Sequence, residues 1–299
     1  IIKRVSHRLT TLFKRMITWT SGEAYIPGPT QESYKPHVND VRFRFHNVQG
    51  LTDKKFRPYY LNTARSNCEV LALAETNCPD DATAHVWAKD WQGSGGAFWA
   101  TAPHKCRGMA ILLSSTLGDT GAHVVWKDPL GRAIAIKARI RNVPTMIIAS
   151  HADSHSDSEQ ALFYEKLRSH IPHDPECTYV WLMDANNVSN PTLDARRSDG
   201  KQSDQTRPNG VSKLHVCAQE WGGVNTGGTA LQDAFRCRYP NAKEFTRHSI
   251  HSEQLNSWRR IDRIYVSHSC TIQGAQVPAV ERVTHIRPSD EQMRSLIGR

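Results

Sequence analysis

The chain has 299 residues, of which 38% are hydrophobic and 22% are charged, as in an ordinary globular protein. Its 38 Lys and Arg against 29 Asp and Glu give a formal net charge of +9, which favours a polyanionic partner, with nucleic acid ahead of membrane. No apolar stretch approaches the roughly 20 residues of a membrane span, and the seven scattered cysteines form no Cys-x-x-Cys pair, which argues against a zinc ribbon or a secreted disulfide framework and indicates reduced thiols in an intracellular protein.

The first 40 residues differ in texture from the rest. Residues 1–21 place apolar side chains at helical spacing beside five Lys or Arg and no acid. This indicates either a basic amphipathic helix that touches nucleic acid or a membrane surface, or the tail of an upstream region. Residues 22–40 contain Pro and Gly without periodicity and are expected to form a linker. Because the chain begins with Ile1, we expect a fragment of a longer product or a processed form, with a folded domain over 41–299.

From Val41 onward, short apolar runs alternate with helical or polar stretches. The runs predict strands over 41–47, 69–75, 108–113, 132–139, 144–150, 178–183, 260–267 and 277–284. Helical spacing predicts helices over 54–66, 156–170 and 212–221, the second opening on a capping box, Ser156 with Glu159. The polar stretch 190–210 is expected to be a long surface loop. Many strands with few helices indicate a layered α/β protein with two packed sheets.

Several predicted strands end on a polar side chain. The clearest is Val180–Asn186, where four apolar residues precede Asp184 and Asn186, which period-2 geometry turns to one side. Asn47 and Glu75 also end predicted strands, Asp262 lies within a predicted apolar strand, and Asp290 follows Pro288 near the end of the sequence. Polar residues that merely cap strands would also fit. However, a buried carboxylate is costly unless it is paired or binds metal, and converging oxygen ligands suit a hard ion such as Mg²⁺.

The order of these residues resembles the endonuclease/exonuclease/phosphatase superfamily. Within it, the chain is most similar to the endonuclease domain of non-LTR (LINE-type) retrotransposons, which are relatives of apurinic endonucleases and deoxyribonuclease I. The resemblance covers roughly 42–297 and rests on His46–Leu51, Leu73–Thr76, Cys106–Leu113, Leu231–Arg236 and Arg260–Ser267. It implies an α/β fold of the deoxyribonuclease I-like type, a two-layer β-sandwich flanked by helices, with the site where both sheets open.

The resemblance also implies roles for single residues. Glu75 would be the principal ligand of Mg²⁺ or Mn²⁺, assisted by Asn47 and Asp290. Asp184 would orient or deprotonate the attacking water, and Asn186 would hold the scissile phosphate. His151 resembles the histidine that deoxyribonuclease I has there, and Asp262 would orient a histidine that follows the Asp of a Ser-Asp-His motif.

The family places a DNA-contacting loop just before the Asp262 strand. Here that loop, 241–259, combines cations with an aromatic side chain, so we expect substrate contacts from Arg247, His248, Trp258 and Arg259. Three other tryptophans, Trp87, Trp91 and Trp99, could also stack on bases, but we expect them in the core.

One position departs from the family pattern. After Ser289 and Asp290 comes Glu291 instead of the expected His, which sets two carboxylates side by side. A decayed or mutated copy, replacement of the histidine by His285 or His151, and an altered metal arrangement would each explain it. Loss of such a group typically costs orders of magnitude in rate.

The resulting hypothesis is a nuclear, Mg²⁺-dependent endonuclease that nicks DNA for a retroelement, with a reverse transcriptase in the same polyprotein. Two alternatives stay open. One is a catalytically inactive domain that binds DNA through its basic surface. The other is a phosphoester hydrolase of the same superfamily that acts on a small or lipid substrate.

Overall fold

The structure is a computed structural model that describes residues 41–91, 95–102, 107–154, 156–199, 207–243, 245–252 and 255–270. The predictions for 1–21, 22–40, the strand 277–284, Asp290 and Glu291 lie outside these residues. None of the described helices is both long and apolar enough to cross a bilayer.

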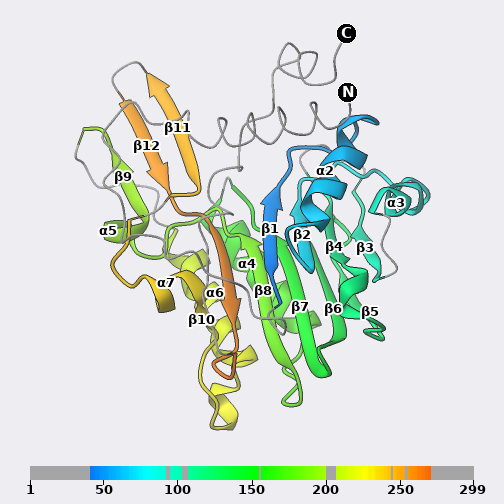
Figure 1. Ribbon diagram of the computed structural model, residues 1–299. Coiled ribbons are helices and arrows are strands. Elements are labelled where there is room, and N and C mark those ends of the chain that lie inside the picture. Colours follow the sequence, from blue (N-terminus) through cyan, green and yellow to red (C-terminus); the bar gives the residue numbers. More distant parts are fainter. Residues whose placement is uncertain are drawn as a thin grey trace. The chain divides into compact units, whose positions relative to one another are not determined.

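Two sheets form the centre of the described part of the chain (Figure 1). The first, in spatial order, contains β1 (Phe43–Asn47), β2 (Val70–Ala74), β4 (Met109–Leu113) and β3 (Ala97–Ala100). The second contains β10 (Gln232–Asp233), β13 (Asp262–Val266), β8 (Thr178–Asp184), β7 (Val143–His151), β6 (Ala133–Ile140) and β5 (His123–Lys127). Each of these sheets contains one parallel pair of strands, β1 with β2 in the first and β7 with β8 in the second.

A third, smaller sheet pairs segments that are distant in the sequence. It consists of β11 (Arg247–Ser252), β12 (Leu255–Arg259) and β9 (Ala195–Arg197). β11 and β12 form an antiparallel hairpin in which Arg247 lies opposite Arg259. Figure 1 shows this sheet beyond the carboxyl end of β8, next to the start of β13.

Most of the described helices pack on the outer faces of the two large sheets. The described helices are α2 (Phe56–Arg65), α3 (Asp81–Ala88), α4 (Asp157–His170), α5 (Pro191–Asp194), α6 (Pro208–Trp221) and α7 (Ala234–Arg238), with single 3₁₀ turns at Lys89–Trp91, Ser115–Leu117 and Val224–Thr226. α2 and α3 pack on the first sheet, and α4 and α6 pack on the second.

Apolar side chains fill three layers in this arrangement. Between the sheets, Phe45, Ile111, Ile147 and Leu182 belong to one buried cluster. β2 and β8 are buried on both faces, which is why their sequences are continuous apolar runs instead of alternating ones. Such strands can expose polar side chains only where they end.

The structure agrees with most of the predicted elements. β1, β2, β4, β6, β7, β8 and β13 lie within about two residues of the predicted strands, and α2 and α4 of the predicted helices. The capping box is present, since Ser156 Oγ accepts a hydrogen bond from Glu159 N. Trp87, Trp91 and Trp99 are buried core residues, as expected.

Two predicted loops were wrong. The stretch 190–210 contains α5 and β9, and α6 begins at Pro208 instead of 212. Asn190 caps α5 through its side chain, and Pro191 occupies its first turn, where a missing N–H costs nothing. The stretch 241–259 is not a loop but contains the β11–β12 hairpin, whose polar sequence hides the strand pattern.

Candidate active site

The site lies where the carboxyl ends of two parallel strand pairs meet. Asn47 is the last residue of β1, and Glu75 follows β2 in the first sheet. His151 and Asp184 are the last residues of β7 and β8 in the second sheet, and they are register partners. Since parallel neighbours end at the same edge, each sheet presents its two polar side chains together.

Short distances connect the two sheets at this edge. Asn47 Nδ2 donates to Glu75 Oε1 at 2.8 Å and to Asp184 Oδ2 at 3.3 Å. His151 Nε2 lies 3.6 Å from Glu75 Oε1 and 3.8 Å from Asp184 Oδ2. Four side chains from four strands therefore surround one small volume, with an imidazole between two carboxylates.

Asn186 reaches the same place from the segment after β8. Its backbone N–H donates to Asp184 Oδ1 at 3.1 Å, and its side-chain Nδ2 donates to Ala152 O at 3.0 Å. Arg247 on β11 places Nη1 3.5 Å from Asn186 Oδ1. The site thus combines carboxylates on one side with an amide and a guanidinium on the other.

Asp262, the first residue of β13, lies directly opposite Asp184 in the sheet. Asp262 is 4% exposed. Neither of its carboxylate oxygens meets the distance and angle of a hydrogen bond within the described ranges. Burial, and next the charge of Asp184, raise the pKa of Asp262 well above its usual range, while the nearby Thr246 hydroxyl, Arg263 and Arg247 oppose the shift. The residue expected to face it, at position 291, is outside the described residues.

The expected substrate contacts have different outcomes. Arg247 reaches the site, and Arg259 lies opposite it on β12. Burial, followed by the charges of Arg247 and Arg207, lowers the pKa of Arg259, because the three cations lie near one another. His248 and Trp258 are cross-strand partners in the same hairpin. The prediction that their side chains bind substrate stays a prediction.

Within the described residues, Glu75 and Asn47 are the candidate ligands of a divalent cation. In the described part of the chain, no three His, Cys, Asp or Glu side chains form a metal-binding group. Glu75 and Asn47 offer oxygen donors of the kind that Mg²⁺ prefers, although Asn47 turns its amide nitrogen toward Glu75 and its Oδ1 accepts from Gln49 N. The third predicted ligand, Asp290, lies outside the described residues. The chemistry of the donors fits a hard cation.

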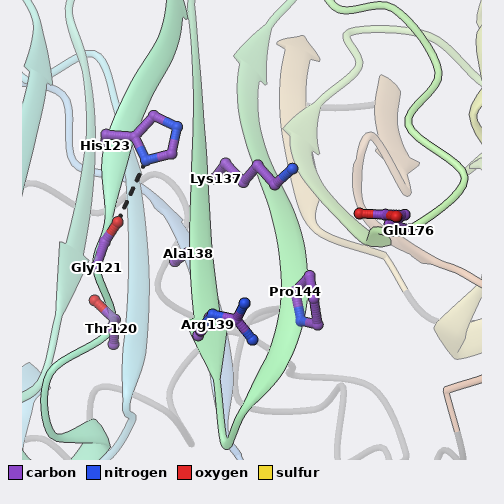
Figure 2. A pocket seen from close by; sticks show the side chains of 8 residues that line it. All are labelled: Thr120, Gly121, His123, Lys137, Ala138, Arg139, Pro144 and Glu176. Carbon is purple, nitrogen blue, oxygen red and sulfur yellow. Dashed lines mark hydrogen bonds between the residues drawn. The ribbon is translucent and has the colours of Figure 1, made fainter.

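A hollow of about 170 Å³ lies elsewhere, beside β5, β6 and β7 (Figure 2). Pro144, which lines it, is near the opposite end of β7 from His151, roughly 23 Å away by the rise of an extended strand. Its Lys137 is paired with Asp174 at 2.7 Å. This hollow is therefore separate from the site.

Sequence reasoning missed two residues that hold the site, Gln160 and Arg207. Gln160 lies on the buried face of α4 with Phe163, Tyr164 and Leu167. A polar side chain at a core position of a helical pattern was the available signal. Arg207 precedes Pro208 and gave no comparable signal.

The described residues form two packed sheets with helices on their outer faces, and solved structures of the deoxyribonuclease I-like fold match this arrangement, so the predicted fold class is confirmed. Two solved structures that share it are apurinic (AP) endonucleases. The enzyme from Archaeoglobus fulgidus matches with a TM-score of 0.52 and 15% identity over 76% of this chain and 87% of its own. The enzyme LMAP from Leishmania major matches with a TM-score of 0.55 and 14% identity over 85% of this chain and 89% of its own. No protein-family model and no curated protein sequence matches the chain. At these identities the likeness establishes the fold.

Proposed function

We propose that this protein is a divalent-metal-dependent endonuclease that hydrolyses a DNA phosphodiester. The observation that carries the proposal is the meeting of Asn47, Glu75, His151, Asp184 and Asn186 at one edge of the two sheets. The fold it shares with two AP endonucleases and the net charge of +9 support it further.

Glu75, with Asn47 and Asp290, would hold Mg²⁺ or Mn²⁺, which when bound supplies positive charge to the phosphate and to the leaving oxygen. Asp184 takes the proton of the attacking water, because its Oδ2 lies in the shared volume and its Oδ1 is held by Asn186 N. His151 lies within reach of the same water. Asn186 has a second amide hydrogen for a phosphate oxygen, and Arg247 adds a cation beside it.

The water oxygen forms a bond to phosphorus while the bond from phosphorus to the 3′ oxygen breaks. The 3′ oxygen takes up a proton, so the products are a 3′ hydroxyl and a 5′ phosphate. A 3′ hydroxyl is the end that a polymerase extends. We therefore extend the proposal to the target-nicking domain of a non-LTR retroelement that acts in the nucleus and hands the primer to a reverse transcriptase.

A supercoiled-plasmid nicking assay with and without Mg²⁺ tests this function. We expect Glu75→Gln and Asp184→Asn to lower nicking by at least about 100-fold, in line with the loss of a catalytic group. Glu165→Gln is the matched control, because Glu165 is an exposed carboxylate of α4 paired with Lys213. Metal-independent nicking, or full activity of both site variants, would refute the assignment.

A second candidate, a DNA-binding domain without activity, is favoured by one specific feature. The family histidine that Asp262 would orient is replaced by Glu291. Nicking by Glu291→His but not by the parent chain would identify a decayed enzyme. Absence of nicking by both, together with salt-sensitive DNA retention, would favour the binding domain. Release of phosphate from inositol or nucleotide phosphates would indicate the small-substrate hydrolase instead.

A further inference from the structure

A buried glutamine, Gln160, is hydrogen-bonded to the backbone of the segment that carries Asn186. Gln160 Nε2 donates to Asp153 O at 2.7 Å and to Ala185 O and Asn186 O at 3.1 Å each. Its Oε1 accepts from Asn187 Nδ2 at 3.1 Å. The residue is 0% exposed. The Gln160 amide thus joins the segments that follow β7 and β8 to α4, and it does so without exposure to solvent.

An arginine also donates hydrogen bonds to two of these carbonyl groups, Asp153 O and Asn186 O. Arg207 Nη1 donates to Asp153 O at 2.8 Å and to Asn186 O at 3.1 Å, and Nη2 donates to Ser154 O. Arg207 immediately precedes α6, so a second helix is tied to the loops. Because Nη1 and Nη2 donate to backbone carbonyl groups, Arg207 holds these loops, whereas Arg247 contacts the Asn186 side chain.

The two helices are themselves locked together at this point. Asp157, in the first turn of α4, accepts hydrogen bonds from Asn209 N at 3.2 Å and Gly210 N at 2.7 Å in the first turn of α6. A Cβ at Gly210 would lie 2.3 Å from Gln160 Oε1 and 2.9 Å from Gln160 Cβ. The missing side chain of Gly210 therefore lets α6 approach Gln160 closely.

This clamp, defined as Gln160 and Arg207, fixes an unusual backbone. Asn186 has φ of +46°, in the left-handed region that non-glycine residues seldom occupy. With its carbonyl directed at the clamp, its side chain is free to turn the other way, to Ala152 O and Arg247. The conformation that presents Asn186 to the site thus depends on contacts from two helices that have no place in the site.

We propose that Gln160 and Arg207 are positioning residues that act on the reaction through Asn186. This inference rests on the proposed function, because it assigns the clamp to the group expected to hold the phosphate. Neither residue would touch substrate. Their removal should misplace the Asn186 amide, and a displacement of about 1 Å can cost on the order of 100-fold in rate.

A double-mutant cycle on nicking activity tests the route through Asn186. We expect Gln160→Met and Arg207→Met each to lower kcat about 10- to 100-fold with little change in KM, with partial recovery in Arg207→Lys. In an Asn186→Ala background, Gln160→Met should lower kcat less than about threefold, because the group it positions is already gone. Equal losses in both backgrounds would overturn the proposal.

Two variants separate positioning from mere destabilisation. Leu214→Ala removes a buried apolar side chain of α6, and Gln219→Met makes the same chemical change as Gln160→Met on the exposed face of α6. Both should keep the kcat of the parent chain. If Leu214→Ala lowers kcat as much as Gln160→Met, a structural role is sufficient and the proposal fails.

Hydrogen exchange gives a readout that does not need activity. In a peptide that covers 185–188, Gln160→Met and Arg207→Met should speed exchange at least tenfold, while Leu214→Ala should leave it near the rate of the parent chain. Unchanged exchange would overturn the clamp even if the parent chain nicks DNA. If these variants exchange faster but the parent chain nicks no DNA, the clamp still holds the segment. Its catalytic role is then overturned together with the proposed function.

Discussion

The buried arginine that anchors the small sheet allows a quantitative prediction. Arg260 follows β12 directly, and its side chain is 2% exposed. Its Nε lies 2.9 Å from Asp194 Oδ1, and its Nη2 lies 2.8 Å from Asp233 Oδ2. Burial alone would lower the pKa of Arg260, but the charges of Asp233 and Asp194 outweigh it and raise the pKa. Arg236 is the second cation bonded to Asp194.

Arg260→Met would remove the central cation and leave two carboxylates with too little compensation. Breaking a buried ion pair from one side costs about 3 to 5 kcal/mol. For a domain of this size, about 2 to 4 °C per kcal/mol predicts a Tm lower by about 6 to 20 °C. The free energy of unfolding should be measured by urea denaturation at pH 7, with tryptophan fluorescence as the signal.

Two further variants make this measurement specific. Arg168→Met removes an exposed cation that pairs with Glu220, so it should change stability by less than about 1 kcal/mol. Arg260→Met combined with Asp194→Asn should be less destabilising than the sum of the single changes, because the stranded charge is removed as well. A loss below about 1 kcal/mol for Arg260→Met alone would refute the reasoning.

Three further predictions concern the site itself. Because Asp262 binds its proton more tightly in the folded state, its ionisation destabilises the fold by about 1.4 kcal/mol per pH unit between the unfolded carboxyl pKa, near 3.9, and the raised folded value. Asp262→Asn should therefore gain stability relative to the parent chain as the pH of urea titrations rises from 4 to 7, and a constant difference would contradict this. Gly108→Ala should cost about 1 to 3 kcal/mol in the same assay, since Gly108 has φ of +94° and a Cβ would lie 2.4 Å from Thr76 Oγ1; an unchanged midpoint would exclude the clash. Arg247→Ala should weaken DNA retention and reduce the slope of log affinity against log salt by about 1, and an unaltered slope would mean that Arg247 contacts no phosphate.

The sequence alone predicts the elements whose patterns are local. β2 and β8 are continuous apolar runs, and α4 has both a capping box and a periodic buried face. In these segments the residues that set the structure lie within a few positions of one another. Sequence reasoning therefore locates them well, and the errors there are one or two residues at the ends.

Two of the missed elements, β9 and β11, depend on backbone pairing that their own sequences do not record. β9 has only three residues, and it is a strand because it pairs with β12. Its Arg197 lies opposite Ser257, about 60 residues further along the chain. β11 has the sequence Arg-His-Ser-Ile-His-Ser, which shows no apolar face. Its strand conformation comes from backbone pairing with β12, which no local pattern records.

The site was predicted by combining two kinds of information. Local patterns identify polar residues at strand ends, such as Asn47 and Asp184, but they do not show that two different sheets bring them within 3.3 Å. That convergence was expected only because the order of residues resembles a known superfamily. Gln160 and Arg207 were missed because the resemblance concerns groups that would touch substrate, not those that hold them.

Local preference and site geometry also oppose each other in this chain. Glu75 and Asn186 have φ of +54° and +46°, in a region that costs a non-glycine residue on the order of 1 kcal/mol or more. Both lie beside backbone hydrogen bonds to distant segments. Next to Glu75, Thr76 N donates to Gly108 O, and beside Asn186, Ala185 N donates to Ile261 O. Sheet edges and the clamp therefore impose these conformations from outside, which explains why a site of strained residues can be read from the sequence as a set of positions but not as a geometry.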